Sequence, residues 1–147
     1  PDWTLYLIGQ PTGFDITKHF AETVCHQIEV IGTITSKQEM IDRLQQMRIM
    51  FLPSRLESFG LVFTEAMACG SAMVGGRTGF NYTIKDEAIV VDNANIQAYE
   101  QAIENLMGNE ADCQALANKG YQLVQQLNWS SVQDKYLSFI NDKVKTN

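Results

Sequence analysis

The sequence predicts an α/β protein in which a parallel sheet is flanked by helices. Short apolar runs alternate with segments of helical periodicity, which is typical of a parallel sheet covered on both faces. Several runs are followed by Gly or Pro, as expected where a buried strand ends in a turn. The last third of the chain has helical periodicity alone, so the strands are expected before it.

The first half of the chain is expected to contribute three strands. The apolar runs that predict them are residues 5–9, 28–32 and 49–52. A turn cluster at residues 10–13 precedes a helix expected to run to about His26. Ser36 and Glu39 have the spacing of a capping box and predict the start of a second helix.

The second half is expected to add two strands and then helices. The strands are predicted at residues 72–75 and 88–91, with a short helix after Gly79. Three apolar stripes at helical spacing are expected to face the core, at residues 96–107, 111–127 and 132–140. Gly108 is a predicted C-cap, and Gly120 a predicted interruption of the second of these helices.

Composition excludes several classes of function. The net charge of −6 and the acidic pI argue against nucleic acid or an anionic membrane as a partner. No apolar run is long enough to cross a bilayer. Three widely spaced cysteines predict reduced thiols in the cytoplasm. Cys25 and His26, with His19 nearby, lack the spacing of a metal site, and they are interpreted as ordinary helix residues.

The stretch from residue 53 to residue 70 carries the main functional signal. It follows a predicted strand, and a helix is expected to begin near residues 58–60, so free amides and the helix dipole would favour an anion there. Glu57 and Glu65 stand eight positions apart, on the order of 12 Å at helical rise. That length fits a nucleotide diphosphate sugar. Each carboxylate would accept hydrogen bonds from sugar or ribose hydroxyls, with the diphosphate on the amides between them.

These residues resemble the E-x7-E motif of retaining glycosyltransferases of the GT-B fold, family four in particular. The motif reads ESFGL from Glu57 and EAMACG from Glu65. Flanking similarities are the Pro53-Ser54 turn, the strand after Gly70, and the Asn128-Trp129-Ser130 position, so the resemblance covers about residues 4–140. The alternative interpretation makes both glutamates ordinary surface residues of a helix.

The resemblance implies a Rossmann-like fold and a role for each residue of the motif. Residues 1–147 would be one nucleotide-sugar-binding domain, the C-terminal half of a two-domain protein, without that half's first strand and helix. The implied site residues are Glu57 as the catalytic position contacting the donor sugar, the amides of Ser58, Phe59, Gly60 and Leu61 facing sugar and diphosphate, Glu65 at the ribose, and Thr33 and Ile34 at the base. No metal and no other cofactor are expected.

The implied reaction transfers a sugar from a nucleotide diphosphate sugar to an acceptor hydroxyl with retention of configuration. A glycan or lipid-linked acceptor would bind an absent N-terminal domain. Surface polysaccharide biosynthesis is the expected setting, in the cytoplasm and at the inner membrane face for the full-length protein. The family's Arg and Lys for the diphosphate are missing, and Arg55 and Arg77 occupy other positions. Without the missing strand, exposed strand edges predict homo-oligomers or marginal stability.

Two other functions remain as alternatives. The chain is also compatible with a nucleotide or nucleotide-sugar binding module that performs no catalysis. A third interpretation is another GT-B activity, such as a sugar-nucleotide epimerase or a phosphorylase. The ESFGL and EAMACG context argues against this third interpretation, and no lysine is identified as a pyridoxal-binding residue.

Overall fold

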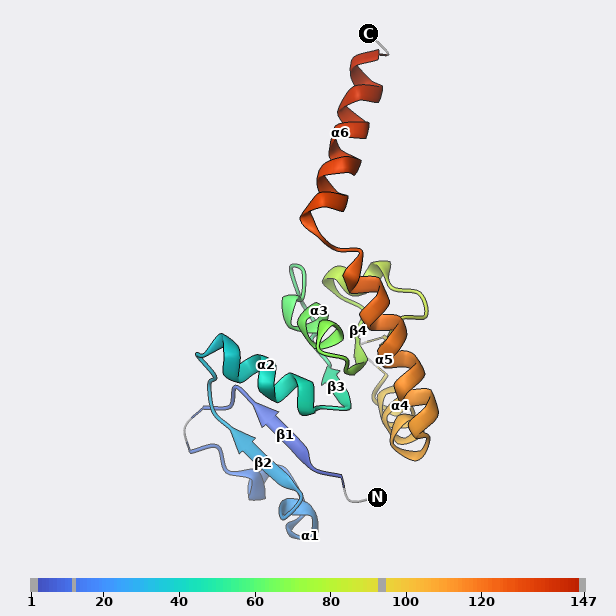
Figure 1. The fold of residues 1–147 in the computed structure, drawn as a ribbon. Helices are drawn as coiled ribbons and strands as arrows, with labels where there is room; N and C mark the ends of the chain where they lie inside the picture. The colour runs from blue at the N-terminus through green and yellow to red at the C-terminus, as the bar shows by residue number, and fades with distance from the viewer. Residues whose placement is uncertain (1–2, 12, 93–94, 146–147) are drawn as a thin grey trace. The chain divides into compact units, whose positions relative to one another are not determined.

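The computed structural model describes residues 3–11, 13–92 and 95–145. The chain divides into two compact units, Pro1–Arg43 and Leu44–Asn147. Every strand pair is parallel, and helices connect the strands (Figure 1). The predicted α/β class is therefore confirmed, while the organisation of residues 1–147 as one domain stays a prediction.

The first unit is built on two parallel strands. Strand β1 (Leu5–Ile8) pairs with β2 (Ile28–Ile31), so that Leu5 lies opposite Ile28 and Ile8 opposite Ile31. Both strands match the predicted apolar runs.

The connection between β1 and β2 differs from the single helix that the sequence predicted. It contains a 3-10 helix, η1 (Ile16–Lys18), and a one-turn α1 (Glu22–Cys25). The carboxylate of Asp15 caps η1 by accepting from Thr17 N at 3.1 Å and from Thr17 Oγ1 at 2.6 Å. Ala21 is extended, with φ −62° and ψ 140°, and breaks the helix between the two segments.

Helix α2 (Lys37–Gln46) begins at the predicted capping sequence. Ser36 Oγ accepts a hydrogen bond from Glu39 N at 3.3 Å, which is one half of a capping box. Ser71 Oγ donates to the carbonyls of Leu44 and Met47, at 3.3 and 3.0 Å, and all three residues belong to the second unit.

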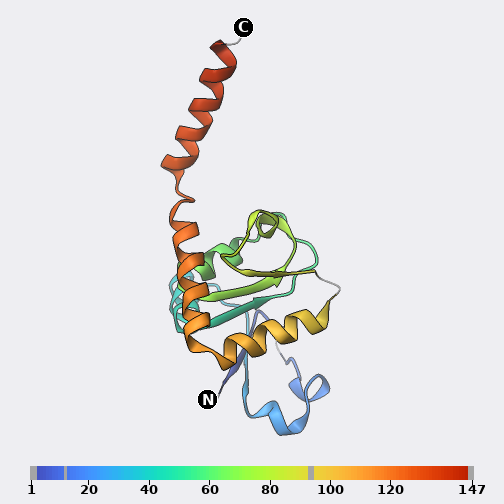
Figure 2. The same ribbon diagram turned by 90° about the vertical axis from the view of Figure 1, so that its right-hand side faces the viewer.

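The second unit contains a three-stranded parallel sheet in the order β3-β4-β5. Its strands are β3 (Ile49–Leu52), β4 (Ala72–Gly76) and β5 (Ile89–Val91). Its helices are α3 (Leu61–Ala68), η2 (Gly79–Thr83), α4 (Ile96–Gly108), α5 (Glu110–Gln125) and α6 (Trp129–Lys145). Figure 2 shows α4 lying along the strands of this sheet. All three strands were predicted, with bounds within one residue.

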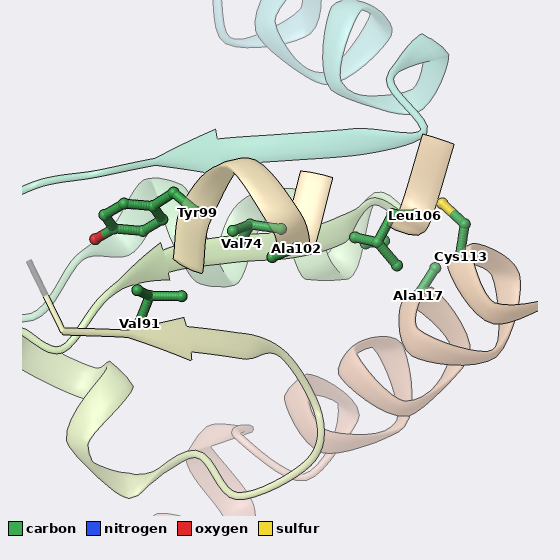
Figure 3. Packing of buried hydrophobic residues seen from close by; sticks show 8 residues of the cluster. Val74, Val91, Tyr99, Ala102, Leu106, Cys113 and Ala117 are labelled. Carbon is green, nitrogen blue, oxygen red and sulfur yellow. The ribbon is translucent and has the colours of Figure 1, made fainter. Parts of the chain in front are cut away.

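Helices cover both faces of this sheet, and the alternation of side chains along β4 shows how. Ala72 and Val74 point to one face and pack with residues of α4 and α5, including Tyr99 and Leu106 (Figure 3). Gly75 points to the other face, where a Cβ atom would lie 2.5 Å from a ring carbon of Phe63 in α3. A side chain at this position would therefore require the Phe63 ring to move.

Two predictions about glycines in the helical region are wrong. Gly108 is the last residue of α4, and Asn109 is both its C-cap and the N-cap of α5, accepting from Asp112 N at 3.2 Å. Helix α5 continues without a break through Gly120. A Cβ atom on Gly120 would lie 3.2 Å from the carbonyl oxygen of Glu87 and from Met67 Cε, so glycine permits close packing here.

Helix α6 does not bury the apolar stripe that the sequence assigned to the core. Its exposed apolar residues are Trp129, Val132, Tyr136, Leu137, Phe139 and Ile140. None of the described helices combines the length and the apolar character needed to cross a membrane.

One edge of β1 and one edge of β3 carry no strand. Among the described residues, β1 pairs only with β2, and β3 pairs only with β4. A parallel strand with an open edge presents N–H and C=O groups to which another strand can pair.

Candidate functional site

The turn between β3 and α3 presents a row of amides without acceptors. Gly60 is the N-cap of α3 with φ 86° and ψ 54°, a left-handed conformation that favours glycine, and no side chain caps the helix. The helix starts with Phe63 N donating to Gly60 O at 3.0 Å. Among the described residues, no hydrogen-bond acceptor is found for the N–H groups of Ser58, Phe59, Gly60, Leu61 and Val62.

These amides lie where a parallel sheet usually binds its ligand. The turn follows the carboxyl end of β3, and the residues after β4 and β5 follow carboxyl ends at the same edge of the sheet. Unpaired N–H groups at a helix N-terminus, with the helix dipole behind them, attract an anion. Anion binding by the amides of residues 58–61 stays a prediction.

The loop after β4 fixes the position of Glu57. Phe80 N donates to Phe59 O at 2.8 Å, and the two phenyl rings stack with centroids 5.3 Å apart. Gly79 lies so close to this turn that a Cβ atom would be 2.6 Å from Phe59 O and 3.2 Å from Glu57 Cβ. Glu57 is half-buried as a result, with its side chain against the loop.

Glu65 lies on the exposed side of α3, one turn after the helix begins. The predicted span of about 12 Å between Glu57 and Glu65 assumed helical rise over all eight positions. Only Leu61 to Glu65 is helical, because the chain enters α3 through the left-handed Gly60. The two carboxylates therefore flank the amide row from different elements, one in the turn and one on the helix.

The thiol next to Glu65 is held in its neutral form. Burial raises the pKa of Cys69, and the negative charge of Glu65 raises it further. A thiol with a raised pKa is a poor nucleophile at neutral pH, so Cys69 adds no reactive group to the site.

Thr33 and Ile34 lie in the first unit, on the connection that follows β2. Thr33 is exposed and Ile34 is half-buried. The two residues thus follow the carboxyl end of a parallel strand, as the motif in the second unit does.

The structure also reveals a pocket that sequence reasoning did not assemble. It has a volume of about 300 Å³ and lies at the carboxyl ends of β3, β4 and β5. Its lining residues are Arg55, Leu56, Glu57, Arg77, Thr78, Gly79, Tyr82 and Asp92. The sequence could have pointed to this pocket, because each of its lining residues follows a predicted strand and the strands end at the same edge of the sheet.

Metal-ligating residues are not clustered in the part of the chain that the structure describes. No group of three or more His, Cys, Asp or Glu side chains is placed there to hold an ion. Cys25, Cys69 and Cys113 are free thiols.

The fold and site define an α/β protein with a turn of unpaired amides at the carboxyl end of a parallel strand. Residues 1–123 match the family described as glycosyl transferases group 1, and the chain belongs to that family. It is 23% identical to a D-inositol 3-phosphate glycosyltransferase of Corynebacterium diphtheriae, over 96% of this chain and 35% of the relative. The chain thus spans about a third of that relative's length.

Solved structures with this fold are glycosyltransferases of the GT-B type. The C-terminal domain of a glycosyl transferase group 1 family protein from Francisella tularensis is 28% identical, with a TM-score of 0.71 over 86% of this chain and 70% of that one. Anabaena HepE in complex with UDP has a TM-score of 0.72 at 15% identity, over 97% of this chain and 42% of that one. The resemblance to a C-terminal GT-B half is thereby confirmed.

The close approach of Gly79 to Phe59 predicts that Gly79→Ala destabilises the protein. Gly79 has φ 51°, and the added Cβ would meet a backbone oxygen at 2.6 Å, which cannot move aside as a side chain would. We expect the free energy of unfolding in urea to fall by about 1–3 kcal/mol.

Gly108→Ala is the matched control, since no atom lies within 4 Å of the new Cβ and its φ is not positive. We expect it to change the free energy of unfolding by less than about 1 kcal/mol. Equal effects of the two substitutions would contradict the packing described here.

Proposed function

We propose that this chain is the donor-binding part of a retaining glycosyltransferase. The observation that carries the proposal is the row of unpaired amides, residues 58–62, flanked by Glu57 and Glu65. A diphosphate needs donors and carboxylates provide none, so the amides suit the diphosphate and the two glutamates suit hydroxyls on either side of it.

Each residue of the site has a role in this proposal. Glu57 accepts hydrogen bonds from the donor sugar at the reacting end and is the catalytic position. The amides of residues 58–61 face the sugar and the diphosphate, and Glu65 holds the ribose. Thr33 and Ile34 contact the base.

The reaction moves the sugar to an acceptor hydroxyl with its anomeric configuration retained. Backbone donors stabilise the charge that develops on the leaving diphosphate, and the proposal needs no metal for this step. The described site supplies binding groups for a donor only. We therefore expect the chain by itself to bind a nucleotide diphosphate sugar without transferring it, as a binding module would.

The proposed acceptor, product and cellular location rest on the resemblance to the family. A glycan or a lipid-linked acceptor would bind an N-terminal domain, and the product would be a surface polysaccharide. The reaction would take place in the cytoplasm, with the full-length protein at the inner membrane face. The complex of Anabaena HepE with UDP supports the choice of a uridine nucleotide as the first ligand to test.

Calorimetric titration with UDP, GDP and ADP at low salt and without metal tests the donor site. We expect one nucleotide to bind and Glu65→Ala to weaken that binding at least tenfold, because a hydrogen bond to a charged group contributes roughly 1.5–3 kcal/mol.

Glu57→Ala is the matched comparison, since it also removes one carboxylate. It should leave the affinity for the nucleoside diphosphate nearly unchanged and remove the added affinity of the nucleotide sugar. Loss of nucleoside diphosphate binding in Glu57→Ala, or full binding in Glu65→Ala, would contradict the assigned roles.

We also propose that the chain associates with itself through the open edges of β1 and β3. Among the described residues each of these strands has a partner on one side only. Light scattering at increasing protein concentration should therefore show homo-oligomers, or thermal unfolding should be broad. A monomer that melts cooperatively would contradict this proposal.

A further inference from the structure

The pocket beside Glu57 has binding groups that the nucleotide does not use. It is formed by residues that follow β3, β4 and β5, and it holds about 300 Å³. That volume is at the lower end of the range for small-molecule sites. Glu57 belongs both to this pocket and to the turn that carries the amide row.

Two guanidinium groups line this pocket without an ion pair. Arg55 and Arg77 are exposed, and neither lies within 4.0 Å of a carboxylate among the described residues. In contrast, Arg43 and Arg48 pair with Glu29 and Glu110. The donors of Arg55 and Arg77 are therefore available to a ligand.

A buried hydroxyl without a partner lies in the wall of the same pocket. Thr78 is only 7% exposed, and its Oγ1 atom has no hydrogen-bond partner. A buried polar group without a partner costs free energy. Because the Oγ1 atom is itself buried, a ligand in the pocket meets the rest of Thr78 and does not reach this oxygen.

The charges of the lining residues limit the charge that a ligand of this pocket can carry. Arg55 and Arg77 contribute two positive charges, and Glu57 and Asp92 contribute two negative charges. These four charges cancel, so a dianionic phosphate would leave a net charge of −2 in the pocket, whereas a single carboxylate would leave only −1. A single carboxylate fits a guanidinium group in the bidentate manner, and hydroxyls can donate to Glu57.

We propose that this pocket is a subsite for a hexose that carries one carboxylate, a hexuronate. The carboxylate binds Arg77 and Arg55, and ring hydroxyls donate to Glu57. The exposed ring of Tyr82 covers the apolar side of the sugar. The inference deepens the proposed function, because it rests on Glu57 holding a sugar of the substrate.

Binding of methyl β-glucuronide, methyl β-glucoside and glucose 6-phosphate to the chain, measured by NMR titration, tests this subsite. The glucuronide should bind at least tenfold more tightly than the other two. Arg77→Gln and Arg55→Gln should each weaken glucuronide binding about tenfold, through the loss of a charged hydrogen bond. Both side chains are exposed, so the folded spectrum should persist.

Lys135→Gln is the matched control, because it removes one positive charge from an exposed position on α6. It should leave glucuronide binding unchanged. Equal binding of the neutral glucoside, preference for the phosphate, no binding of the glucuronide, or an equal effect of Lys135→Gln would overturn the proposal.

Nucleotide titrations of the same samples separate the two proposals. Nucleotide binding without glucuronide binding would overturn only the hexuronate subsite. Glucuronide binding that depends on Arg77, without binding of any nucleotide, would overturn only the donor site.

Discussion

The contact on which the site depends is the hydrogen bond from Phe80 N to Phe59 O. It holds the loop after β4 against the turn after β3, and the stacked rings of the two residues support it. Gly79 makes this approach possible because it has no Cβ atom to meet Phe59 O. The amide row and the pocket therefore share the contact between these two loops.

Backbone amides lie on one side of this contact, and the side chains of the pocket lie on the other. On one side, the left-handed Gly60 leaves the amides of the turn without acceptors among the described residues. On the other side, Arg77 and Thr78, in the loop after β4, line the pocket. Glu57 lies between the two, because it belongs to the turn after β3 and also lines the pocket.

The strands were predictable because burial on both faces makes each of them a short apolar run. The residues Ile49 to Leu52 form such a run, and the structure gives the same bounds. The motif from Glu57 to Gly70 was equally clear, since strand, turn and helix follow in the order that an anion site requires. The family match over residues 1–123 agrees with that interpretation.

Other features depended on contacts that the sequence does not show. Gly120 suggested a break in α5, but the helix continues through it, and a Cβ atom there would lie 3.2 Å from Glu87 O and from Met67. Ala21 gave no signal that it would be extended and divide the helix predicted up to His26. The pocket was not foreseen because it joins residues from three turns whose distances depend on how the loops pack.

The most direct test of the account is to map the amide resonances that shift when a nucleoside diphosphate binds. An assigned nitrogen–proton NMR spectrum would be titrated with UDP, GDP and ADP in turn. The account predicts the largest shifts at the amides of residues 58–62, with smaller shifts along α3. Saturable shifts confined to residues outside the turns that follow the strands, or no shifts with any of the three, would contradict it.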